Sequence, residues 1–250
     1  MEYVNYLASG FTHKATQEDP RNGGGELVLY NPTAEPCQAT MTVYFEDREP
    51  RTLAPIGVKP ETNALVIMPG LAPDVFTDCG FWGAKVLSTA PLILNFINGI
   101  RIFVEKPRFR GGCTNFHGTK LHPEWHFPDC HWVDWNRPGA EEVGLVTTLR
   151  NELEYTHVLN PNPVDTEITV TLRYRNLAPA TMRFNIGAER VWVWRNLEQV
   201  EVNQPYAMVI QASQPVSASV VRYNYSPAGF GDWGMTVRCA MYGVPGPVEA

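Results

Sequence analysis

Histidines and cysteines gather in one short segment of the chain. Four of its six histidines and two of its five cysteines lie between positions 113 and 131: Cys113, His117, His122, His126, Cys130 and His131. Neutral imidazole and thiolate groups are the natural protein ligands of Zn²⁺ and similar transition metals. One hypothesis is therefore a metal site, with zinc or another transition metal, built from this cluster.

The spacing within this segment also allows a simpler interpretation. Its order of ligand types fits no closed zinc pattern, and His122-Pro-Glu-Trp-His126 is not the His-Glu-x-x-His motif of metalloproteases. In the alternative, the segment connects two domains, and its histidines form local hydrogen bonds or line a subunit contact. If residues 125–131 form a strand, His126 and Cys130 share one face and His131 points to the other.

A second set of residues suited to ligand binding lies further along the chain. In Val191-Trp-Val-Trp-Arg195 the alternation of a strand places both tryptophans on one face. Two such indoles can stack on a sugar ring, and arginines can bind a carboxylate or phosphate. The candidate ligand-binding residues are Arg190, Trp192, Trp194, Arg195 and Arg222. The alternative is that the tryptophans lie in a core or an oligomer contact and the arginines are solvated.

Motifs of common enzyme classes are missing from the sequence. It contains no Gly-x-Ser-x-Gly elbow, P-loop or EF-hand pattern. Gly229-Phe-Gly-Asp-Trp-Gly234 spells Gly-x-Gly-x-x-Gly, but too few residues follow it for the acidic residue that a dinucleotide site needs about 20 positions on. A hairpin loop is the better interpretation. We therefore expect no catalytic residues and no cofactor other than the metal considered above.

Composition excludes several broad classes of protein. The 250 residues are 44% hydrophobic and 18% charged, which is enough apolar material for a core. A net charge of −6 argues against a nucleic-acid binder with a basic surface. No apolar run approaches the ~18 residues needed to span a bilayer, and the N-terminus lacks the pattern of a signal peptide. We expect a soluble, cytoplasmic protein with reduced cysteines and no membrane insertion.

Short alternating segments separated by Pro and Gly predict strands throughout. In residues 38–46, Ala39, Met41, Val43 and Phe45 fall on one face. In residues 167–175, Ile168, Val170, Leu172 and Tyr174 do the same. Turn residues at intervals of about 8 to 12 are typical of a sandwich or barrel. The predicted fold class is all-β and antiparallel, with almost no helix.

These two segments are part of an internal repeat. Asn31-Pro32 aligns with Asn160-Pro161, and Thr40, Thr42, Pro50 and Thr52 then align with Thr169, Thr171, Pro179 and Thr181 without a gap. We therefore predict two tandem antiparallel β-sandwich domains related by internal duplication. The first covers residues 1–110, the second covers 125–250, and residues 111–124 form a His- and Cys-containing connector.

The repeated segments resemble the soluble sensory rhodopsin transducer family. The resemblance rests on Leu29-Tyr-Asn-Pro-Thr-Ala-Glu-Pro36, on the strand and turn up to Pro50, and in the second copy on Phe184–Arg190 and Ser213–Arg222. It implies a β-sandwich that assembles through its sheets into a homotetramer and serves binding or signalling. The family has a basic strand at a position where the first copy keeps a single positive charge, Lys59. The second copy has Trp192 and Trp194 between its arginines there.

Three functions are consistent with these observations. The first is a non-catalytic, oligomeric binding module that recognises a small ligand or a protein partner, in signalling if the resemblance holds. The second is a metal-dependent enzyme, or an accessory subunit of one, that uses the cluster at 113–134. The third is a structural assembly protein. In the first and third, the chain binds at least one other copy of itself, as a homodimer or a higher oligomer.

Overall fold

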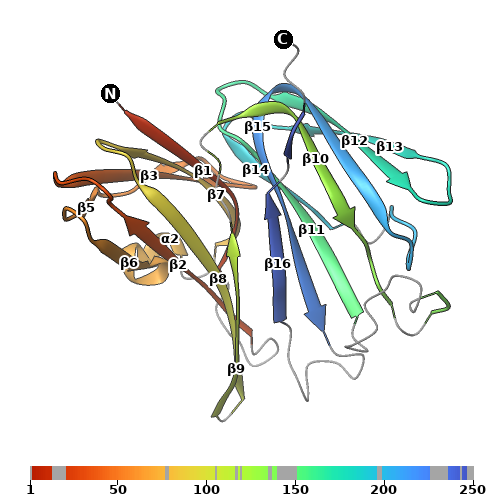
Figure 1. The fold of residues 1–250 in the computed structure, drawn as a ribbon, viewed down its shortest axis with the longest axis horizontal. Coiled ribbons are helices and arrows are strands. Elements are labelled where there is room, and N and C mark those ends of the chain that lie inside the picture. The colour runs from red at the N-terminus through yellow and green to blue at the C-terminus, as the bar shows by residue number, and fades with distance from the viewer. Residues whose placement is uncertain are drawn as a thin grey trace.

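The computed structural model describes most of the chain and is built almost entirely of strands (Figure 1). The described residues are 2–12, 21–76, 79–104, 106–115, 118, 120–134, 137–139, 151–195, 199–225, 236–242 and 244–246. Among them, no helix is long and apolar enough to cross a membrane. The predicted all-β, antiparallel fold is confirmed.

The first half of the molecule, drawn in red to yellow-green in Figure 1, runs from β1 to β9. One sheet has the strand order β1-β7-β3-β4, with β5 also on β3, and the other has the order β6-β2-β8-β9. Two helices of four residues each precede β7. The elements are β1 (Tyr3–Thr12), β2 (Arg21–Tyr30), β3 (Cys37–Phe45), β4 (Arg51–Thr52), β5 (Ile56–Val58), β6 (Asn63–Ile67), α1 (Met68–Leu71), α2 (Pro73–Phe76), β7 (Gly80–Ser88), β8 (Ile93–Val104) and β9 (Lys106–Asn115).

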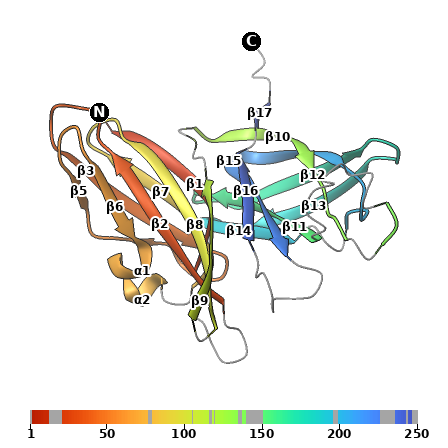
Figure 2. The ribbon, with the colours of Figure 1, turned by 60° about the horizontal axis from the view of Figure 1, so that its bottom comes forward.

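The second half, drawn in green to blue, repeats this arrangement of strands (Figure 2). Its strands pair in the orders β13-β12-β15-β10-β17 and β14-β11-β15-β16. Strand β15 belongs to both, whereas in the first half β7 and β8 are separate strands. The elements are β10 (His122–Cys130), β11 (Asn151–Asn160), β12 (Thr166–Tyr174), β13 (Ala180–Ile186), β14 (Arg190–Arg195), β15 (Tyr206–Tyr225), β16 (Thr236–Tyr242) and β17 (Val244–Pro245).

Each half has its own hydrophobic core between its two sheets. The alternating residues of β3 and β12 point inward as the sequence predicts, and Ala39, Met41, Ile168 and Val170 are completely or almost completely buried. Trp82 and Phe96 fill the first core, and Trp125 and Phe127 fill the second. Burial of these side chains is the main stabilising contribution of each half.

Strands at the ends of the two halves show where pairing begins and stops. Strands β1 and β10 open the two halves and pair with β7 and β15 in corresponding places. Strand β9 continues through position 110 to Asn115, so pairing in the first half extends into the expected connector.

The two halves pack face to face through one sheet of each. The side chain of Leu159 on β11 lies against Ala8 and Tyr44, on the outer face of the β1-β7-β3 sheet. Nearby, the Phe81 ring of β7 contacts the rings of Tyr155 and His157, with centroids 5.6 and 5.4 Å apart. The outer face of the β14-β11-β15 sheet is therefore an internal interface.

Candidate binding site

Trp192 and Trp194 lie on the core side of β14. As predicted, they share one face: their ring centroids are 6.3 Å apart and their planes differ by 15°. Phe184, from the opposite sheet, packs on both rings at 4.6 and 5.9 Å. Trp194 is only 6% exposed and belongs to the second core. The two indoles are thus occupied by protein side chains within the sandwich.

Arg190 and Arg195, at the two ends of the same strand, contact other parts of the protein. Arg190 forms an ion pair with Glu49 of the first half. The guanidinium of Arg195 lies over the ring of Tyr155, 5.6 Å from its centroid, in a cation–π contact. Arg190 therefore links the two halves.

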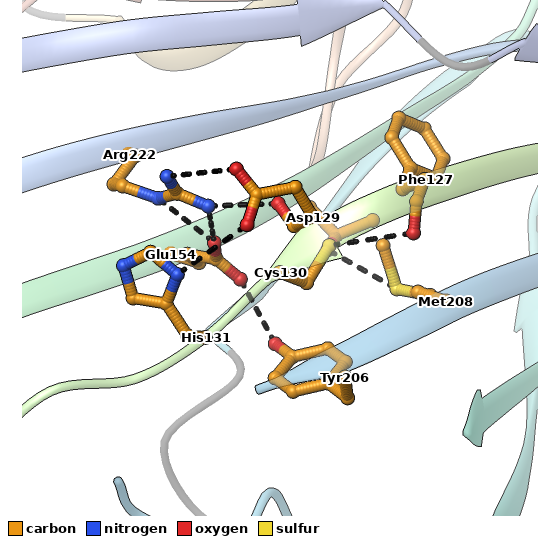
Figure 3. A network of polar contacts seen from close by, with 9 residues as sticks. Phe127, Asp129, Cys130, His131, Glu154, Tyr206, Met208 and Arg222 are labelled. Carbon is orange, nitrogen blue, oxygen red and sulfur yellow. Dashed lines mark hydrogen bonds and ion pairs between the residues drawn. The ribbon is translucent and has the colours of Figure 1, made fainter. Parts of the chain in front are cut away.

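Arg222 lies in a buried polar network inside the second half (Figure 3). Its Nε and Nη2 donate to Oε1 of Glu154 at 3.0 and 2.7 Å, and Nη2 also donates to the carbonyl of Asp129 at 2.8 Å. The hydroxyl of Tyr206 donates to the other oxygen of Glu154 at 2.9 Å. These contacts occupy N–H groups of Arg222 that would otherwise bind the carboxylate or phosphate of a ligand.

The charge of Glu154 depends on this network. Complete burial raises the pKa of its carboxyl group, while the guanidinium of Arg222 and the backbone N–H of His131 oppose that rise. Breaking such a buried pair on one side leaves an uncompensated charge. Glu154 and Arg222 are neighbours on the paired strands β11 and β15, and their hydrogen bonds to Tyr206 and to the carbonyl of Asp129 link this sheet to the other.

The five candidate ligand residues thus lie in three different environments. The tryptophans are in the core, Arg190 and Arg195 are on the side of the first half, and Arg222 is inside the polar network. The structure does not bring them together around one pocket. Glu154, which completes the network, is a residue that the sequence analysis missed, and no local pattern distinguishes it.

The described histidines and the described cysteine of the candidate metal cluster lie in different surroundings. The ring of His122 contacts Trp125, His126 is partly exposed, and Cys130 and His131 are buried. In the described part of the chain, no three His, Cys, Asp or Glu side chains are placed to hold a metal ion. His117, the side chain of Cys113 and the Gly229–Gly234 loop lie outside what the structure describes.

The expectation that His126 and Cys130 share a face is wrong. The register of β10 against β15 shifts between Phe127 and Cys130, so that Cys130 turns into the core while His126 stays on the outer face. A bulge of this kind inserts a residue and reverses the alternation beyond it. Alternation in the sequence alone does not reveal such a shift.

A shallow hollow lies on the outer face of β10, β15 and β12. Its volume is about 410 Å³, and its lining includes both polar and apolar side chains. Glu124 accepts hydrogen bonds from Gln211 at 2.8 Å and interacts with His126 at 2.7 Å, and these bonds lower the pKa of its carboxyl group. We call this surface the acceptor face; its residues are Glu124, His126, Thr171, Arg173, Ala207, Val209 and Gln211.

In the first half, the corresponding face is covered. It is the outer face of β1, β7 and β3, on which Leu159 of the second half lies. A side chain at Gly83 would place its Cβ 3.2 Å from Leu159, so glycine allows the close approach. Next to this contact, burial and the charge of Glu189 raise the pKa of Tyr44 to about 12. One face thus binds a protein surface, and its counterpart in the second half forms the hollow.

Comparisons with known proteins give only weak similarities. No known family and no curated protein sequence matches the chain. Thermotoga maritima 1070 is 15% identical with a TM-score of 0.40, over 50% of this chain and 96% of that protein. The Anabaena sensory rhodopsin transducer is 16% identical with a TM-score of 0.31, over 39% of this chain and 92% of that protein. A similarity at this level does not establish membership in a family.

A third similarity is weaker still. A β-glucuronidase of Bacteroides uniformis matches 96% of this chain at 8% identity and a TM-score of 0.18, and the chain spans 26% of that enzyme. The sequence resemblance to the transducer family is therefore accompanied by a weak structural similarity to one transducer, and its functional implications remain proposals.

Proposed function

We propose that this protein is a non-catalytic recognition module whose binding surface is the acceptor face of the second half. The observation that supports this proposal is the contact between the halves. The outer face of β1, β7 and β3 holds a protein surface, and the acceptor face is formed by strands of the same order and pairing. The ligand is therefore a protein surface rather than a small molecule held in a deep pocket.

The chemistry of the acceptor face fits recognition. Val209 and Ala207 give it an apolar centre, and Arg173 provides an exposed charge at one side. The low pKa of Glu124 keeps its carboxylate ionised at neutral pH, which suits an acceptor of hydrogen bonds and not a proton donor. Interfaces commonly combine an apolar centre with polar groups at the rim.

We further infer that the two halves arose by duplication and that the module works in the cytoplasm. The equal strand orders and the recurrence of Asn31 as Asn160 support the duplication. The free thiol of Cys37 suits a reducing compartment. If the resemblance to transducers extends to function, recognition on this face serves signalling.

His126 offers a direct test because its side chain is 40% exposed and lies on the acceptor face. Diethylpyrocarbonate modifies accessible imidazoles, and peptide mass spectrometry gives the rate of modification at His126. We expect that rate, divided by the rate at His122 in the same sample, to fall at least threefold when dilute protein is concentrated or mixed with an extract of its source cells. A rate at His126 that changes in neither condition would refute the proposal.

A further inference from the structure

The outer face of the other sheet of the first half carries an exposed apolar surface. Leu65, Ile67 and Ile93 are 60, 56 and 57% exposed, and Tyr30 between them is 40% exposed. They are neighbours across three paired strands: Tyr30 lies opposite Ile93, and β6, with Leu65 and Ile67, pairs with the other side of β2. We call these four residues the apolar face. Contiguous exposed patches of this kind commonly mark a protein interface.

The strand pairings show which surface of the second half corresponds to the apolar face. Tyr30 directly precedes Asn31, as Leu159 directly precedes Asn160. Tyr30 pairs with Asn63 and Ile93, and Leu159 pairs with Val191 and Ser217 in the same way. The apolar face is thus the counterpart of the surface of β14, β11 and β15 that is buried against the first half.

Two surfaces meet between the halves, and each of them has an exposed equivalent in the other half. Within one chain, the outer face of β1, β7 and β3 binds the outer face of β14, β11 and β15. The acceptor face corresponds to the first of these surfaces, and the apolar face corresponds to the second. From this correspondence we propose that the acceptor face of one chain binds the apolar face of a second copy. This proposal rests on the proposed function and names its partner.

The charges at the two faces support this pairing. Within the chain, Tyr44 lies beside the carboxylate of Glu189. In the second half, Arg173 on β12 is the equivalent of Tyr44 on β3. Tyr44 pairs with Gly83 of β7, and Arg173 pairs with Ala207 at the corresponding place on β15. Glu61 occupies the position of Glu189. Both glutamates have a positive φ, 51° for Glu61 and 54° for Glu189. The N–H of Glu61 donates to the carbonyl of Thr33, two residues after Asn31. In the same way, the N–H of Glu189 donates to the carbonyl of Asn162, two residues after Asn160.

The proposed contact therefore places Arg173 of one chain beside Glu61 of the other. Both side chains are exposed in the single chain, so they are free to form an ion pair. Opposite charges at an interface favour the correct partner, and like charges oppose it. In a symmetric dimer this contact occurs twice, related by the twofold axis, and covers both free faces of each copy.

Charge reversal of the native chain tests the pairing. Dissociation constants for self-association come from sedimentation velocity over a range of micromolar concentrations. We expect a dimer for the native chain and at least a tenfold weaker association for either Arg173→Glu or Glu61→Arg. The double variant should return to within about threefold of the native constant. Lys120→Glu, which changes an exposed charge that belongs to neither face, is the control and should have no effect.

Leu65→Asp tests the apolar contribution, with Leu177→Asp as its matched control because Leu177 is 45% exposed on a turn of the second half. Both variants should unfold at the same temperature as the native chain, and only Leu65→Asp should weaken self-association. A native chain that stays monomeric, or an oligomer that none of these substitutions weakens, would overturn the proposal. If concentrating the pure protein leaves the labelling of His126 unchanged and the cell extract slows it, the acceptor face binds a different protein: the recognition function then stands and the self-contact fails.

Discussion

Asn160 makes the same contacts in the second half that Asn31 makes in the first. Each side-chain amide donates to the carbonyl four residues on, at 2.7 Å for Asn31 and 2.9 Å for Asn160. Each also reaches the carbonyl that lies 27 residues ahead, and each Oδ1 accepts from the backbone N–H two residues on. Both side chains are fully buried. One residue thus closes the same turn in both halves.

Because these amides satisfy several buried carbonyls at once, their loss should be costly. Asn31→Ala and Asn160→Ala should each lower the free energy of unfolding by about 1–3 kcal/mol. Chemical denaturation measures the change, and Asn185→Ala on an exposed strand position is the control. The two losses should add to within about 0.5 kcal/mol, because the residues share no partner. A negligible effect at either position would show that the turn does not depend on its asparagine.

The buried pair of Glu154 and Arg222 should respond differently to single and double substitution. Arg222→Met leaves the carboxylate of Glu154 without its partner and should cost about 3–5 kcal/mol. Glu154→Leu combined with Arg222→Met removes both charges and should recover most of that loss. Urea denaturation at neutral pH measures each variant. A double variant as unstable as the single one would mean that the hydrogen bonds from Tyr206, and not the ion pair, stabilise this end.

Truncation of Trp192 should weaken the fold of the second half. Its ring packs on Phe184 and Trp194, so Trp192→Ala creates a cavity and should cost about 3 kcal/mol. Trp192→Phe keeps an aromatic ring in place and should cost less than about 1.5 kcal/mol. Thermal unfolding measures both variants. If Trp192→Ala were as stable as the native chain, the indole would be available for ligand stacking after all.

His157 should make the stability of the protein depend on pH. It is completely buried between the halves with both ring nitrogens unpaired, and burial lowers its pKa from 6.5 to about 3. Between these values the unfolded chain binds a proton that the folded chain does not. Stability from this residue is therefore complete above pH 6.5 and is lost as pH falls, by about 1.4 kcal/mol per unit.

Replacement of His157 isolates this contribution. The His157→Leu variant should lose less stability than the native chain when urea denaturation is repeated from pH 7 down to pH 5. The expected difference in that window is about 2 kcal/mol, on the basis of the same slope per pH unit. Equal pH profiles for His157→Leu and the native chain would show that His157 binds its proton equally well in the folded and unfolded chains.

The sequence by itself determined strands β3, β12 and β14 and which of their residues share a face. The alternation in β3 and β12 predicted that Ala39, Met41, Ile168 and Val170 are buried, and the pattern of β14 predicted that Trp192 and Trp194 lie together. Such inferences succeed because side chains alternate strictly along a strand, so local order in the sequence is enough. The matching Asn-Pro turns likewise followed from sequence alignment alone.

Only the tertiary structure decided what covers each face. Alternation predicts that the two tryptophans share a face but does not reveal that Phe184, from another sheet, packs on them. Arg222 meets Glu154 across 68 positions of sequence, and the bulge before Cys130 reverses the alternation of β10. These relationships depend on the pairing and stacking of distant strands. The outer faces of β1-β7-β3 and of β14-β11-β15 are buried against each other, whereas the equivalent acceptor face and apolar face are exposed. The difference arises because the burial of a sheet face is set by the sheet that packs opposite it.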